Sequence, residues 1–119
     1  MITIPIKPIS TNQLFQGRRF KTKEYNAFLQ AALYFAPKVR MIKGTVSVKL
    51  DFFIKNVARS DVDNLLKGTL DLIVKAGYIE DDRYIYHLKA RKFKVEEEAN
   101  ERIELRIKHL TEKNMMRGK

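Results

Sequence analysis

The stretch GTVSVKLDFFIKNVARSDVDNLLKGTLDLIVKAG, residues 44–77, contains a change of hydrophobic period that organises the whole chain. In its first part apolar side chains alternate with polar ones, and a period of two predicts a half-buried β-strand. In its second part apolar side chains recur at three- and four-residue steps, which predicts an amphipathic helix over about residues 61–76. Gly77 follows as the expected C-cap. The alternating apolar positions are Val46, Val48, Leu50, Phe52 and Ile54.

The chain before this stretch predicts one short strand and one helix. Ile2, Ile4 and Ile6 alternate with other residues, and Pro5, which has no N–H group to donate, keeps this strand near a sheet edge. A polar loop is expected next. Residues 23–36, KEYNAFLQAALYFA, then predict a helix that ends before Pro37. The apolar face of that helix consists of Tyr25, Phe28, Leu29, Ala32 and Phe35 or Ala36.

The chain after Gly77 predicts two further strands. Residues 83–93 alternate, residues 103–107 do so again, and VEEEANE at 95–101 is expected to form a solvated hairpin turn. Strand, helix, strand, helix, strand, strand is the order of an α/β or α+β domain, with a mixed β-sheet of about four strands and two main helices packed on it. We expect one domain over residues 1–110. Residues 111–119 form a basic C-terminal tail without sustained periodicity, expected to be disordered.

Composition narrows the class of protein. The 119 residues contain 24 Lys and Arg against 14 Asp and Glu, a net charge of +10, and such a protein attracts polyanions, of which nucleic acid is the commonest inside cells. Cysteine is absent, which excludes disulfides, thiolate metal sites and thiol nucleophiles. No run of about eighteen apolar residues and no signal-peptide pattern occur, so we expect a cytoplasmic protein with no membrane partner.

Six of the fourteen acidic residues lie between Arg59 and Arg83, against the overall charge. Asp61 and Asp63 stand at the start of the predicted helix, where N–H groups and the dipole favour a carboxylate by about 0.3–1 kcal/mol. Helix capping therefore explains Ser60, as the expected N-cap residue, and one of the two aspartates, but not the second. The side chains of an Asp-x-Asp pair at the end of an extended segment can converge on one point, and such hard oxygen ligands suit Mg²⁺ or Mn²⁺.

Two further features are open to more than one interpretation. Lys67 follows Asp63 by one helical turn. It either forms a plain helix ion pair, worth about 0.2–0.5 kcal/mol, or provides a cation that offsets the charge of a phosphate. The acidic group at residues 80–82 would, by itself, most often be a solvated loop. However, carboxylates massed in a basic protein repel phosphate unless divalent cations lie between them. Metal-dependent phosphodiester hydrolysis places carboxylates in that way.

Residues 59–83 as a whole resemble the signature of the RusA family of Holliday junction resolvases. The matching elements are a basic residue, Asp-x-Asp-Asn-Leu, a lysine three residues after the Asn, an apolar helix ending in Lys-Ala-Gly, and an Asp-Asp pair. Pro8, Ser10 and Asn12 are similar to the family's Pro-x-Ser-x-Asn element. The resemblance implies a homodimeric, Mg²⁺-dependent endodeoxyribonuclease that binds four-way junction DNA and resolves it by paired symmetric nicks, in DNA recombination and repair.

The same resemblance assigns roles to particular residues. The family's metal-binding and catalytic aspartates correspond to Asp61, Asp63 and Asp82, and its essential lysine corresponds to Lys67. Asp81 matches a neighbour of lesser importance. Asn64 and Asp71 match positions that we expect to be structural, the first as a helix-start hydrogen bond and the second as an ion-pair partner of Lys67 or Lys75. If the three aspartates share one ion, their oxygens must come within about 4 Å of one another.

Basic residues near aromatic ones are candidates for contact with DNA. Arg18, Arg19 and Lys21 lie close to Phe15 and Phe20, an interleaving that can clasp a phosphate backbone, although a solvated loop explains it nearly as well. Arg59 precedes the Asp-x-Asp pair and is a further candidate. The alternative function is a non-catalytic basic nucleic-acid-binding protein, in which the carboxylates only cap a helix and decorate a loop.

Overall fold

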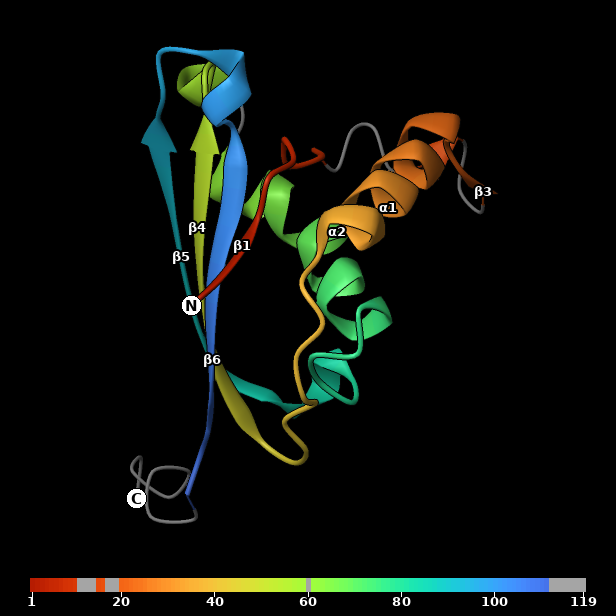
Figure 1. Ribbon diagram of the computed structural model, residues 1–119, viewed down its shortest axis with the longest axis vertical. Helices are drawn as coiled ribbons and strands as arrows, with labels where there is room; N and C mark the ends of the chain where they lie inside the picture. Colours follow the sequence, from red (N-terminus) through yellow and green to blue (C-terminus); the bar gives the residue numbers. More distant parts are fainter. Residues whose placement is uncertain (11–14, 17–19, 60, 112–119) are drawn as a thin grey trace.

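The four-stranded sheet of this protein has both of its long helices on one face (Figure 1). The structure, a computed structural model, describes residues 1–10, 15–16, 20–59 and 61–111. The strands are β1 (Ile2–Ile4), β4 (Val46–Ile54), β5 (Ile85–Lys94) and β6 (Arg102–His109), in the order β1-β6-β4-β5. β5 runs parallel to β4, whereas β6 is antiparallel to both β4 and β1. The predicted compact α+β domain with a mixed sheet and two helices is thus confirmed.

Strand β4 forms the centre of the core, as its alternation predicts. Val46, Val48, Leu50 and Phe52 are fully buried and Ile54 nearly so. The residues between them point to the opposite face of the sheet, because successive side chains of a strand alternate. β1 lies at one edge, where Pro5 directly follows it, and this confirms the expected edge strand.

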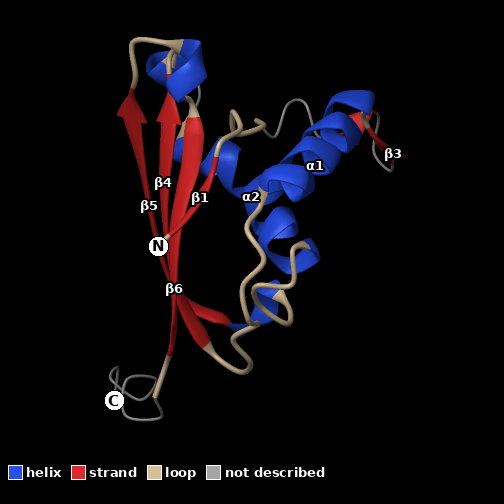
Figure 2. Ribbon diagram, in the orientation of Figure 1, coloured by secondary structure: helices blue, strands red, loops and turns tan. Residues whose placement is uncertain are grey.

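The two helices, α1 (Lys23–Phe35) and α2 (Val62–Lys75), begin and end close to the predicted positions. Thr22 caps α1 by accepting a hydrogen bond from the Tyr25 backbone N–H at 3.0 Å. Gly77 has a φ of +78°, a left-handed conformation that favours glycine, one residue after the α2 C-cap. Both helices cover the same face of the sheet, as Figure 2 shows with helices blue and strands red.

The expected hairpin over residues 95–101 is wrong. β4 lies between β5 and β6, so these residues carry the chain past the end of β4, with a 3₁₀ turn, η4, at Glu98–Asn100. The crossing is held by hydrogen bonds from the Val95 N–H to the Ile54 carbonyl (3.1 Å) and from the Lys55 N–H to Glu101 Oε2 (3.0 Å). Hydrophobic alternation predicts strands but does not say which strands pair, and this accounts for the error.

Two smaller expectations also need correction. The polar loop before α1 contains a short antiparallel pair, β2 (Phe15–Gln16) and β3 (Phe20–Lys21). The strand expected from residue 83 begins only at Ile85, because Asp82–Tyr84 form a 3₁₀ turn, η3. Ser60 and most of the basic tail, residues 112–119, lie outside the described residues. Among the residues that the structure describes, no helix is long and apolar enough to cross a lipid bilayer.

Candidate active site

Helix α2 presents three of the singled-out charged residues along one side. Asp63, Lys67 and Asp71 are spaced four residues apart, which places them one above another on successive turns. The side chains of Asp63 and Lys67 are exposed, and Asp71 is half-buried. Lys67 Nζ lies 3.8 Å from Asp71 Oδ1, so the expected ion pair between these two residues is present.

Asp61 occupies the N-cap position of α2, but its carboxylate makes no capping hydrogen bond. Its backbone carbonyl accepts the hydrogen bond from the Asn64 N–H at 3.0 Å. The helix start is therefore closed by the backbone, and the exposed Asp61 side chain is not held by a capping bond. Capping does not account for this carboxylate in the structure.

The chain returns to α2 after Gly77 and brings the second acidic group against the helix. The segment between α2 and β5 completes the crossover from β4 that a parallel β4–β5 pair requires. It carries η3, which contacts α2 and whose first residue is Asp82. The charges of Lys67 and Asp71 both affect the pKa of Asp82, the first by lowering it and the second by raising it. Lys67 is thus ion-paired with Asp71 on its own helix and also acts electrostatically on Asp82 from η3.

The neighbouring carboxyl groups of Asp81 and Asp82 interact, and their pKa values shift in opposite directions. The hydrogen bond between the two carboxyl groups is the largest cause that raises the pKa of Asp82, followed by partial desolvation, and the ammonium of Lys67 opposes the rise. The pKa of Asp81 is lowered, chiefly because the Arg83 backbone N–H donates to its Oδ1 at 3.1 Å. Asp82 is therefore the carboxyl of this pair that retains a proton more readily.

The donor set fits a hard divalent cation in its chemistry, because Asp61, Asp63 and Asp82 offer exposed carboxylate oxygens. Within the described ranges, however, no three His, Asp or Glu side chains are close enough together to hold a metal ion. A helix rises about 1.5 Å per residue, so Asp63 and Asp71 lie about 12 Å apart along the α2 axis. Asp82 lies near the Lys67 and Asp71 end of that interval, and an ion shared with Asp61 and Asp63 stays a prediction.

A hollow of about 320 Å³ opens beside the start of α2 and includes residues from three parts of the chain. Pro8 and Ser10 come from the N-terminal element, Arg59 from the 3₁₀ turn η2 (Val57–Arg59), and Leu65 from the first turns of α2. Lys7 and Asn56 also line it, and no spacing in the sequence links these two residues to the Asp-x-Asp pair. The tertiary fold thus adds polar side chains near the helix start that the sequence did not indicate.

The other candidates for DNA contact are only partly described. Arg59 is exposed next to the start of α2, a position open to a phosphate backbone. The backbone of Lys21 lies in β3. Arg18 and Arg19 lie outside the described residues, so their contact with DNA remains an expectation.

Comparison with known proteins places these features in a family. A family model described as Endodeoxyribonuclease RusA matches residues 5–108 of the 119-residue chain. No curated protein matches the chain. The matched range includes β4, β5, nearly all of β6, both long helices and the four residues Asp61, Asp63, Lys67 and Asp82, whereas β1 lies before it. The chain therefore belongs to the RusA family of endodeoxyribonucleases, a family of Holliday junction resolvases.

Proposed function

We propose that the protein is a Mg²⁺-dependent endonuclease that acts as a homodimer, binds four-way junction DNA and resolves it by paired symmetric nicks, in DNA recombination and repair. Family membership supports the junction substrate. The observation that carries the assignment of the site is the return of the chain after Gly77, which brings η3 against α2 and Asp82 within range of the charges of Lys67 and Asp71. Residues remote in sequence thereby meet on an exposed side of the domain.

Asp61, Asp63 and Asp82 would hold the divalent ion, with Mn²⁺ able to replace Mg²⁺. When bound, that ion supplies an activated water and neutralises negative charge on the phosphodiester. The chain itself binds and orients the DNA. Arg59 contacts a backbone phosphate beside the α2 N-terminus, and Lys67, held by Asp71, places a positive charge next to the phosphate that reacts.

The proposed function is tested with a synthetic four-way junction labelled on each strand in turn. Incubation with Mg²⁺ is expected to produce nicks at symmetric positions on two opposed strands, and EDTA is expected to suppress them. Linear duplex of the same sequence should be cut far less. Binding of the junction with no cleavage in either Mg²⁺ or Mn²⁺ would instead support the non-catalytic nucleic-acid-binding alternative.

Substitution of Lys67 tests its role next to the phosphate. We expect Lys67→Gln to reduce the nicking rate by about 10²–10³-fold, because removal of one preorganised electrostatic contact to a transition state has an effect of that size. The measurement is a single-turnover rate at saturating protein. Lys75→Gln is the matched control, since Lys75 is an exposed lysine on the same helix, two turns further on. Equal rates for the two variants would remove Lys67 from the mechanism.

Paired nicking requires two active sites, and the end of α1 offers an apolar surface for a second copy. Tyr34 is 82% exposed and Phe35 50%, and their rings are packed edge to face at 5.1 Å. Leu33, Val39 and Met41 are also exposed nearby in the sequence. Aromatic residues are enriched at the centres of protein interfaces. We therefore propose this surface as the dimer contact.

Introducing charges at this surface is expected to separate the subunits. The double variant Tyr34→Glu, Phe35→Glu should be monomeric by light scattering and should leave junctions with one nick instead of two. Tyr86→Glu is the control, because Tyr86 is 63% exposed but lies on β5, away from α1. A double variant that stays dimeric while it remains folded would place the interface elsewhere.

A further inference from the structure

One face of the sheet is covered by neither α1 nor α2, because both helices lie on the other face (Figure 1). We call it the bare face and define it as the four residues of β4 that alternate with its core residues, together with their cross-strand partners on β5 and β6. The β4 residues are Ser47, Lys49, Asp51 and Phe53. Partners in register lie on the same face of a sheet, so the register specifies the composition of this surface.

The register arranges the bare face in rows of three. Lys89, Lys49 and Arg106 lie side by side in one row, with no acidic residue among them. The next row contains Arg91, Asp51 and Glu104. Neighbouring strands are about 4.8 Å apart, so the three cations of the first row are close neighbours. Like charges directly opposite each other destabilise a sheet, which makes this row costly in the absence of an anion.

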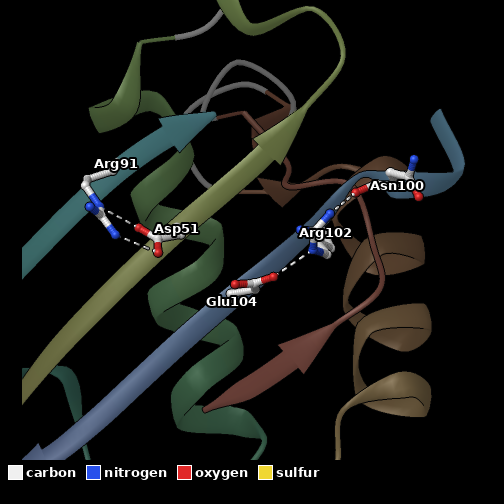
Figure 3. A network of polar contacts seen from close by, with 5 residues as sticks. All are labelled: Asp51, Arg91, Asn100, Arg102 and Glu104. Atoms are coloured by element: carbon white, nitrogen blue, oxygen red, sulfur yellow. Dashed lines mark hydrogen bonds and ion pairs between the residues drawn. The ribbon is translucent and has the colours of Figure 1, made fainter. Parts of the chain in front are cut away.

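The two acidic residues of the bare face are already neutralised. Asp51 accepts two hydrogen bonds from the Arg91 guanidinium, at 2.9 and 3.0 Å, and Glu104 accepts one from Arg102 at 2.8 Å (Figure 3). Figure 3 shows both pairs in front of the strands, with the helices behind. The remaining cations have no ion pair with any acidic side chain in the described part of the chain. They are Lys49, Lys89, Arg106 and Lys108.

The net charge of the bare face indicates which class of molecule can bind to it. It has six basic and two acidic residues, a net charge of +4, and two copies facing each other would repel. The centres of protein interfaces are also depleted in charged residues. A polyanion is the complementary partner, and the net charge of +10 of the whole chain favours the same class.

The aromatic residues of the bare face do not form a platform for bases. Phe53 and Phe93 stack on each other with centroids 5.1 Å apart. The Arg102 guanidinium covers the Phe53 ring at 3.9 Å, and that of Arg91 lies 5.1 Å from the Phe93 ring. The rings thus hold guanidinium groups in place instead of offering free faces for unpaired bases. The surface is suited to phosphates, and its binding is expected to be independent of sequence.

We propose that the bare face is a second DNA-binding surface, which holds the phosphate backbone of a duplex through Lys49, Lys89 and Arg106. It lies on the opposite side of the sheet from α2, so it binds a stretch of DNA other than the one at the active site. In a four-way junction, a duplex arm provides such a stretch. The proposal concerns binding in the absence of metal and does not depend on cleavage.

The test removes the row of three cations from the full-length chain. The triple variant Lys49→Gln, Lys89→Gln, Arg106→Gln is compared with the wild type by anisotropy of a labelled linear duplex, without divalent metal, over about 50–200 mM salt. The slope of log K against log salt is negative, and each lost phosphate contact reduces its magnitude by about 0.9. For three lost contacts we expect the magnitude of the slope to decrease by about 2.7, and the affinity to fall by at least about tenfold at the lower salt concentrations.

A matched control separates a binding surface from an effect of net charge. The triple variant Lys38→Gln, Arg40→Gln, Lys43→Gln removes the same charge from exposed positions between α1 and β4. It is expected to change affinity and slope much less. Lys49→Arg, Lys89→Arg, Arg106→Lys keeps the charges and is expected to retain binding, while circular dichroism checks that each variant is folded.

Three results would overturn the proposal. The first is an equal loss of duplex affinity in the two triple glutamine variants, which would mean that net charge alone explains the effect. The second is loss of binding in the charge-preserving variant, and the third is an unchanged duplex affinity accompanied by a changed oligomeric state, which would make the bare face a protein interface. Failure of the nuclease proposal would look different, because junction binding with its normal salt slope would persist without nicks in Mg²⁺.

Discussion

Asp61→Asn is expected to lower the rate of junction nicking by at least about 10³-fold, a loss of about 4 kcal/mol of transition-state stabilisation. The substitution keeps the shape of the side chain but removes the negative charge that a divalent ion requires. The Asp61 carboxylate makes no capping hydrogen bond, so loss of its charge should leave α2 intact. Single-turnover cleavage in Mg²⁺ measures the rate, and a gel shift without metal measures junction binding, which should be retained.

The two adjacent aspartates after α2 provide an internal comparison for the same measurement. Asp82→Asn is expected to lose cleavage as Asp61→Asn does, whereas Asp81→Asn should retain most of it. The Asp81 carboxylate accepts a hydrogen bond from the Arg83 backbone N–H, whereas Asp82 is the one on which the charges of Lys67 and Asp71 act. Cleavage at the wild-type rate by either Asp61→Asn or Asp82→Asn would refute the proposed metal site.

Phe52→Ala is expected to destabilise the fold by about 3–5 kcal/mol, because it removes a large side chain from the middle of β4 and leaves a cavity. Phe52 is fully buried. Domains of ordinary size have a free energy of unfolding of only about 5–15 kcal/mol, so this substitution removes a large part of the total. Thermal unfolding should show Tm lowered by roughly 10–20 °C.

The neighbouring phenylalanine is the control for that substitution. Phe53 lies on the bare face, half-exposed, and stacks on Phe93. Phe53→Ala removes an aromatic pair and a cation–π contact, and should lower the free energy of unfolding by only about 1–2 kcal/mol. Equal destabilisation by the two substitutions would mean that the sheet does not have one buried face and one bare face.

Much of the local structure follows directly from the sequence, because each pattern depends on residues close together in the chain. The alternation from Val46 to Ile54 predicts which side of β4 is buried, and the burial of that strand agrees. The four-residue steps of α2 likewise place Asp63, Lys67 and Asp71 on one side of the helix. The Asp-x-Asp pair and its lysine were therefore predictable as a unit.

The position of Asp82 relative to that unit was only partly predictable. Its resemblance to a family position gave it a role, and the glycine after α2 indicated that the chain turns there. Whether its carboxylate reaches Lys67 depends on the path of the crossover between α2 and β5, and that path depends on packing against the rest of the domain. The hollow that joins Pro8 and Ser10 to Arg59 depends on packing in the same way.

Composition and periods of two and 3.6 residues are enough to predict the two long helices, the strands of the four-stranded sheet, the basic charge and the candidate aspartates. The position of β4 between β5 and β6, which rules out a hairpin at residues 95–101, depends instead on long-range strand pairing. The same pairing places Lys89, Lys49 and Arg106 in one row. The physical reason is that strand pairing joins residues about forty or more positions apart, through backbone hydrogen bonds that every residue type except proline can both donate and accept.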